Sequence, residues 1–244
     1  VGADEAMFTG WARSLLAGKN ASAMTLFDED LRAAVAVARA KRRELESFEV
    51  RDVRDAERKA ALLKDADIAL RRVKLGCDLL VGVRLLPDLS KKEREQRLSD
   101  LLVEYTASEQ PVSAAAGESL AAAQKAQAFH WPFEFPEVFE RGGFSAYVGN
   151  PPFIGGRRIR ESLGDQYRDA LYGLFQGSSG NADYSAFFFL RGYRGLRRNG
   201  TLGLIATNTI AQGDTRRTGL DNILKEGGTI YAATNNMLWP GAAA

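Results

Sequence analysis

Short apolar runs of strand length alternate with helical patterns in the second half of the chain, and this alternation is the strongest constraint on the fold. The strand-like runs are residues 144–148, 201–207 and 229–233. The helical patterns between these runs are residues 162–173, 183–197 and 215–225. Strands that alternate with helices indicate a parallel sheet covered on both faces. We therefore predict an α/β fold with about three strands.

The first half of the chain has the periodicity of helices alone. Apolar residues recur there at three- and four-residue spacing, which is typical of amphipathic helices. The predicted helices start at Asp28 or Asp30, at Val53, after Ser90 and at Ser113. Proline ends the second helix at residue 87, and Ser90-Lys91-Lys92-Glu93 has the capping-box pattern. The change in pattern divides the chain into a helical region, 1–127, and an α/β region, 128–244.

The composition excludes several classes of protein. The net charge is only +2, so any contact with nucleic acid must come from a local patch rather than from the whole chain. No apolar run reaches about 18 residues, so no membrane span is expected. The single cysteine, Cys77, cannot form an internal disulfide, which fits the cytoplasm. With one histidine, His130, and no cysteine cluster, no metal site is expected, and His130 is interpreted as structural.

Two basic runs allow more than one interpretation. Lysines and arginines in the helical region are interleaved with acidic residues, which favours a solvated helix face over contact with a DNA backbone. Arg157-Arg158-Ile159-Arg160 follows a proline-rich motif closely. This second run is either a solvated turn or a phosphate contact, because the guanidinium group pairs well with phosphate.

That motif is Gly149-Asn150-Pro151-Pro152-Phe153, directly after the first predicted strand. Ligand sites of open α/β sheets lie at the carboxyl ends of strands. Two successive prolines fix the backbone and remove two N–H donors, so the main-chain carbonyls stay available as acceptors. Asn150 adds a side-chain carbonyl, and Phe153 adds an aromatic face. The motif therefore predicts paired acceptors beside a ring, although a proline-rich turn with a core aromatic is the structural alternative.

Paired acceptors suit the exocyclic amino group of adenine. Its nitrogen lone pair is delocalised into the ring, and two acceptors that hold its two hydrogens favour a pyramidal nitrogen able to attack a methyl group. Stacking on Phe153 would be worth about 1–3 kcal/mol. It would offset part of the cost of extruding the base from a duplex, which is on the order of a few kcal/mol.

Several motifs resemble those of one enzyme class. Gly149-Asn150-Pro151-Pro152-Phe153 resembles the catalytic motif of amino-methylating DNA methyltransferases. The wider series is similar to the large single-chain type IIG/IIL restriction–modification enzymes, and it covers roughly residues 128–244. The helical half resembles, less specifically, an insertion within their methyltransferase domain. The motifs that carry the resemblance are Ile154-Gly155-Gly156-Arg157, Asn181-Ala182-Asp183-Tyr184, Leu204-Ile205-Ala206-Thr207-Asn208, Gln212-Gly213-Asp214-Thr215-Arg216 and Trp239-Pro240-Gly241.

The resemblance implies an adenine-specific DNA methyltransferase with a partial Rossmann-like sheet, S-adenosyl-L-methionine as cofactor and double-stranded DNA as partner. It implies that Asn150 and the Pro151 carbonyl accept from the target amino group and that Phe153 stacks on the base. The further implied contacts are Pro152, Trp239 and Arg157 to the substrate, Asn181 and Asp183 to the cofactor, and Thr207 and Asn208 at the pocket border.

One expected element is missing from the sequence. No glycine-rich strand–loop–helix opening of the kind that binds S-adenosyl-L-methionine is found, and in such enzymes it would lie before Val1. We therefore expect a fragment, inactive alone, whose parent polypeptide supplies that loop, a nuclease domain and a target-recognition domain. The alternatives are a stand-alone phage-defence methylase, a methylase of RNA or protein glutamine, and a non-catalytic helical interaction module.

Overall fold

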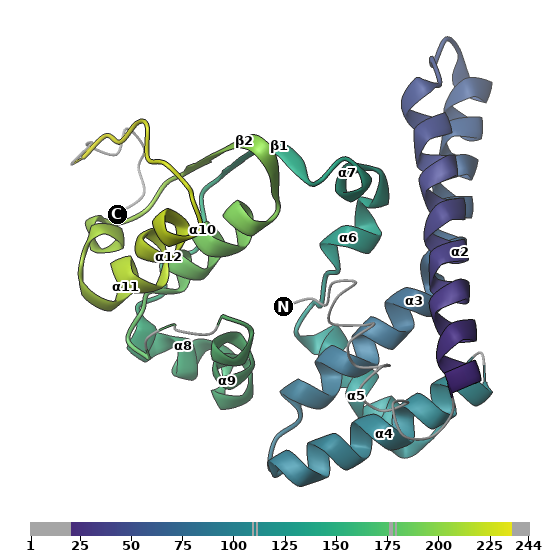
Figure 1. The fold of residues 1–244 in the computed structure, drawn as a ribbon, viewed down its shortest axis with the longest axis horizontal. Helices are drawn as coiled ribbons and strands as arrows, with labels where there is room; N and C mark the ends of the chain where they lie inside the picture. The colour runs from purple at the N-terminus through teal and green to yellow at the C-terminus, as the bar shows by residue number, and fades with distance from the viewer. Residues whose placement is uncertain (1–20, 109, 111, 176–177, 179, 236–244) are drawn as a thin grey trace. The chain divides into compact units, whose positions relative to one another are not determined.

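The structure is a computed structural model in which residues 21–108, 110, 112–175, 178 and 180–235 are described. The chain divides into two compact units, Val1–Arg141 and Gly142–Ala244. The first unit is helical in its described part, and the second combines a small sheet with helices (Figure 1). Among the described helices, none is both long enough and apolar enough to cross a membrane.

Two helices of the first unit begin at serine residues that cap them. The helices of this unit are α2 (Ala21–Ser47), α3 (Val53–Leu85), α4 (Lys91–Ala107), α5 (Ala114–Lys125), α6 (Trp131–Glu134) and α7 (Pro136–Glu140). Ser90 and Glu93 form the predicted capping box of α4, which confirms that prediction. Ser113 caps α5 as expected. The first helix was predicted to start at Asp28 or Asp30, but α2 already includes Ala21.

The core of the first unit lies around α3, which packs against α2 and α5. Apolar residues in the second half of α3, including Leu70, Leu80 and the single cysteine Cys77, are almost completely buried. Cys77 is therefore a core residue. The guanidinium of Arg94 donates to the carbonyls of Val83, Arg84 and Leu86. It therefore satisfies acceptors that the end of α3 leaves without helical partners.

The second unit is built on two parallel strands. They are β1 (Phe144–Gly149) and β2 (Leu196–Leu204), and their pairing confirms the predicted parallel arrangement. Helix α10 (Tyr184–Arg194) packs against β2, and Figure 1 shows it beside the sheet. The remaining elements are α8 (Gly156–Leu163), α9 (Asp165–Leu174), the 3-10 turn η1 (Asn208–Ala211), α11 (Gly213–Thr218) and α12 (Leu220–Lys225).

The core of this unit forms where the helices meet. Ile159 of α8, Leu171 of α9, and Phe187 and Leu190 of α10 are buried together with Ile223 of α12. The helix predicted at 162–173 corresponds to α9, which starts only at Asp165, while residues 162 and 163 end the preceding helix α8. The two helices are separated at Gly164, which has a φ of 86° and so ends α8.

The third predicted strand is not found among the described residues. Residues 229–233 carry no strand hydrogen bonds to β1 or β2, and Tyr231 is 75% exposed. An apolar run becomes a strand only when its backbone pairs with a neighbouring strand, and residues 229–233 pair with neither outer edge of the described two-stranded sheet. The structure is compatible with an α/β fold, while a larger Rossmann-like sheet stays a prediction.

A close approach between α3 and α5 generates a stability prediction. A Cβ atom added at Gly82 would lie 1.9 Å from the carbonyl oxygen of Ser119, so Gly82→Ala must push the two helices apart. We expect the free energy of unfolding, measured by urea denaturation, to fall by about 3 kcal/mol. Gly117→Ala in α5 is the matched control, because nothing lies within 4 Å of its added Cβ. That change should stabilise the helix by about 0.5–1 kcal/mol; equal effects of the two changes would contradict the proposed contact.

Candidate functional site

Residues 150–153, the proline corner, leave the sheet directly after β1. The last backbone hydrogen bond of this edge joins Ile205 N to Gly149 O at 3.2 Å. Gly149 is paired with Leu204 in the parallel register, so both strands end at the same edge of the sheet. Thr207 and Asn208 follow β2 there. This is the edge at which open α/β sheets place ligand sites.

The acceptors of the proline corner are available to a ligand. Asn150 is exposed, and in the described part of the chain its side chain makes no hydrogen bond. The carbonyl of the buried Pro151 accepts no hydrogen bond from another described residue. Phe153 is 45% exposed. The corner therefore presents unused oxygen acceptors next to an accessible aromatic ring.

The proline corner is held in place by the start of α10. Tyr184 N donates to Ile154 O at 2.8 Å. Gly156 is buried, and a Cβ added there would lie 2.4 Å from the carbonyl carbon of Asn181 and 2.7 Å from Ala182 O. The backbones can approach so closely only because residue 156 has no side chain. The structure thus brings the residues that directly follow the proline corner against the 181–183 segment.

The two residues assigned to the cofactor differ in what they can do. Asn181 is exposed beside Gly156. Asp183 is buried and caps α10, because its Oδ1 accepts from the N–H of Ser185 at 2.8 Å and from the Ser185 hydroxyl at 2.7 Å. Its own N–H donates to the buried hydroxyl of Thr215 in α11. Asp183 therefore positions α10 and α11, whereas the Asn181 side chain is free to contact a ligand.

A pair of tyrosines next to the corner was missed by the sequence interpretation. The hydroxyls of Tyr167 in α9 and Tyr184 in α10 are hydrogen-bonded at 2.5 Å, and the Tyr184 ring meets Phe188 edge-on at 5.1 Å. Burial raises the pKa of both phenols, and the hydrogen bond raises the pKa of Tyr184 further. Both therefore stay protonated at neutral pH and serve as packing and hydrogen-bonding groups. The available sequence signal was Tyr184 itself, within the quoted Asn-Ala-Asp-Tyr motif.

Three further residues were predicted to contact the substrate, and the structure describes two of them. Arg157 is exposed in the first turn of α8, and Pro152 is exposed within the corner. Trp239 lies outside the described residues. The structure thus places Arg157 and Pro152 in or next to the corner.

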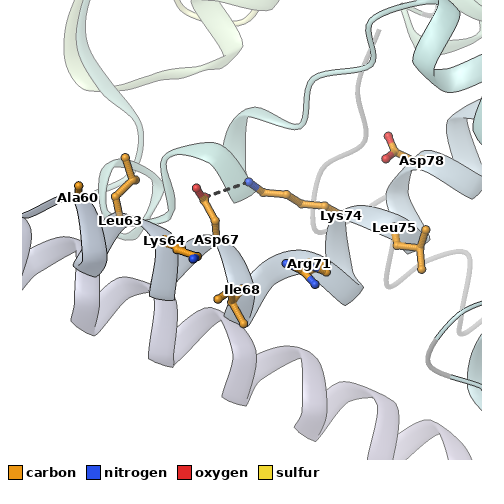
Figure 2. Close-up of a pocket in the computed structure, with 9 residues that line it drawn as sticks. All are labelled: Ala60, Leu63, Lys64, Asp67, Ile68, Arg71, Lys74, Leu75 and Asp78. Carbon is orange, nitrogen blue, oxygen red and sulfur yellow. Dashed lines mark hydrogen bonds and ion pairs between the residues drawn. The ribbon is translucent and has the colours of Figure 1, made fainter. Parts of the chain in front are cut away.

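A pocket in the first unit has no comparable chemistry. Figure 2 shows it along one face of α3, where Lys74 points to Asp67. Lys74 also pairs with Glu134 at 2.9 Å. Asp78 pairs with the buried His130 at 2.9 Å, which fits the structural role predicted for this histidine. No group of metal-ligating side chains is found in the described portion of the chain. The residues that line the pocket are Ala60, Leu63, Lys64, Asp67, Ile68, Arg71, Lys74, Leu75 and Asp78.

The fold and the corner define a class of protein. A parallel α/β unit whose first strand ends in acceptors without a protein partner, beside an accessible aromatic ring, has the organisation of a ligand-binding α/β enzyme. The chain belongs to the family of Eco57I restriction-modification methylases, whose family model matches residues 40–232. It is therefore a restriction–modification methyltransferase in general terms. No curated protein and no solved structure matches the chain.

The contact at Gly156 generates a prediction about the site. Gly156→Ala should move the proline corner away from the 181–183 segment, lower the free energy of unfolding by about 1–3 kcal/mol, and reduce DNA methylation by the full-length protein. The adjacent Gly155 is the control, because its added Cβ meets nothing within 4 Å and its φ is −55°. Gly155→Ala should keep both stability and methylation. If both variants methylate DNA at the wild-type rate, the Gly156 contact does not position the site.

Proposed function

We propose that this methylase transfers a methyl group to the exocyclic N6 of an adenine extruded from duplex DNA, and that the proline corner binds this adenine. The observation that carries the proposal is the pair of unused acceptors, Asn150 Oδ1 and Pro151 O, beside the exposed ring of Phe153. The amino group offers two hydrogens to two oxygens, so the numbers of donors and acceptors match.

The corner acts on the nucleophile. Hydrogen bonds from the amino group to Asn150 Oδ1 and to Pro151 O draw its hydrogens to one side and localise the nitrogen lone pair on the other. S-adenosyl-L-methionine, when bound, supplies the methyl group that this lone pair attacks. The transfer would form a nitrogen–carbon bond and break the carbon–sulfur bond of the donor, which would leave as S-adenosyl-L-homocysteine, and the nitrogen would lose one proton to solvent. Fixed acceptors that match the charge developing on the reacting nitrogen need no reorganisation during the reaction.

Aromatic stacking holds the extruded base. Phe153 is exposed enough to cover one face of the adenine, and a stacked base gains about 1–3 kcal/mol. Trp239 is proposed as the ring on the second face. Pro152 and Arg157 are proposed as further contacts to the substrate, and Thr207 and Asn208, at the same sheet edge, are proposed to border the pocket.

The described residues fit part of a cofactor site. Asn181 is exposed next to the corner and is proposed to contact the methionine end of S-adenosyl-L-methionine, whereas Asp183 supports this segment through its cap of α10. The main cofactor loop is proposed to lie elsewhere in the parent polypeptide, within a bifunctional restriction–modification enzyme. On this proposal, the 244-residue chain alone is inactive.

Removing the Asn150 acceptor tests the assigned chemistry. In the full-length protein, Asn150→Ala should lower the rate of DNA methylation by roughly 100-fold or more, the usual scale for one lost polar contact in a transition state. Methylation is measured by transfer of labelled methyl groups, and the product nucleoside is identified by mass spectrometry as N6-methyladenine. Undiminished methylation would refute the role of Asn150, and N4-methylcytosine would refute the choice of substrate.

The controls for Asn150→Ala are the stability of the variant and its binding of the cofactor. Because the Asn150 side chain is exposed and makes no hydrogen bond among the described residues, its loss should leave the free energy of unfolding unchanged within about 0.5 kcal/mol. Binding of S-adenosyl-L-methionine, measured by calorimetry, should also stay close to wild type. A destabilised variant that no longer binds cofactor would mean that Asn150 is structural.

The stacking role of Phe153 has its own matched pair of variants. Phe153→Ala should weaken binding of DNA that carries an extrahelical adenine analogue by roughly 5- to 100-fold, which corresponds to the stacking energy. Phe153→Tyr keeps the ring and should retain most of the affinity. The fluorescence of 2-aminopurine at the target position reports extrusion, and equal signals from both variants would exclude Phe153 from the base pocket.

A further inference from the structure

An arginine pair lies next to the proline corner on an outward side of α8. The helix starts at Gly156, shortly after Phe153, and its buried side consists of Gly156 and Ile159. Arg157, Arg158 and Arg160 are exposed. Because Gly156 fixes the start of α8 against Asn181, the backbones of Arg157 and Arg158 have a fixed position relative to the corner.

The three arginines of α8 differ in their partners. Arg160 forms an ion pair with Asp165, with Nε and Oδ1 2.7 Å apart. Within the described part of the chain, the side chains of Arg157 and Arg158 form neither an ion pair nor a hydrogen bond. Glu161 is exposed on the same helix and pairs with neither of them. Two guanidinium groups therefore remain available to an external anion.

Neither arginine contributes to the stability of α8. Both lie in its first turn, where positive charges oppose the helix dipole at a cost of about 0.3–1 kcal/mol. Where a local rule is broken without compensation inside the protein, the reason is often a functional one. Arg216 and Arg217 of α11, which are also exposed, are paired with Asp221 and Asp214. Arg198 is exposed without a partner among the described residues, but it lies near the start of β2, toward the end of the sheet opposite the corner.

We propose that Arg157 and Arg158 together bind phosphates of the DNA backbone beside the extruded adenine, and that Arg160 does not. This inference rests on the proposed function and identifies the part of the substrate that the arginine pair contacts. The chain has a net charge of only +2, so binding of DNA needs local positive charge of this kind. The planar guanidinium matches phosphate in bidentate geometry, and such contacts fix the register of a protein on the duplex without reading sequence.

The salt dependence of DNA binding tests the arginine pair without knowledge of the recognition sequence. Affinity of the full-length protein for a fluorescent duplex of arbitrary sequence is measured between 50 and 200 mM salt. Log K falls linearly with log salt, and each lost phosphate contact makes this negative slope shallower by about 0.9. Arg157→Gln and Arg158→Gln should each make the slope shallower by this amount, and the double variant should make it shallower by about 1.8.

Arg160→Gln is the matched control, because it removes the same charge from the same helix at a residue that is already paired. Its slope should stay closer to wild type than that of either single variant. An unchanged slope in the double variant, or an equal loss from Arg160→Gln, would overturn the inference. None of the variants should unfold the protein, since the three side chains are exposed. Arg157→Gln and Arg158→Gln remove a positive charge from the first turn of α8 and should each raise the free energy of unfolding by about 0.3–1 kcal/mol.

The outcomes separate this inference from the proposed function. Asn150→Ala removes no positive charge and should keep the wild-type salt slope while it loses methylation. If the arginine variants keep the slope and Asn150→Ala abolishes adenine methylation, only the phosphate contact is wrong. If the arginine variants make the slope shallower but the product is not N6-methyladenine, the phosphate contact stands and the proposed substrate fails.

Discussion

The parallel pairing of β1 with β2 is the interaction on which the rest of the site depends. Parallel strands end at the same edge of a sheet, so the register that joins Gly149 to Leu204 brings the ends of two distant segments together. The proline corner follows one strand, and Thr207 and Asn208 follow the other. Because α10 packs on β2, its amino-terminal segment can also contact the corner. One pairing thus places segments around residues 150, 181 and 207 at a common site.

Much of this arrangement follows from local sequence patterns. Ser90 and Glu93 specify a helix start that needs no information from elsewhere in the chain, because both capping hydrogen bonds form within four residues. The first two strand-like runs were recognised by their apolar character, and the helices between them required a parallel connection. The proline corner was placed correctly after β1 because a strand followed by two prolines has few other conformations.

The remaining features depend on partners that are distant in sequence. The tight approach of Gly156 to Asn181 and the cap that Thr215 provides for Asp183 N–H involve segments about 25–30 residues apart, and helix periodicity contains no information about such pairs. The glycine pair 155–156 was a usable signal, since glycine often marks a close backbone approach. The run at 229–233 shows the opposite error, because an apolar pattern was taken as a strand, although these residues pair with neither β1 nor β2.

Asp183 shows why residue type alone does not determine a functional role. A carboxylate within a motif near the reacting groups suggests ligand contact, yet this one is buried and bonded to the backbone and hydroxyl of Ser185. Asn150, Arg157 and Arg158 are polar groups near the same sheet edge that have no partner among the described residues. Natural proteins satisfy most of their polar groups internally or with water, and a satisfied group is committed to the fold. The unsatisfied amide and guanidinium groups are therefore the better candidates for contact with DNA, and the capped aspartate is the residue that keeps the segments of the site together.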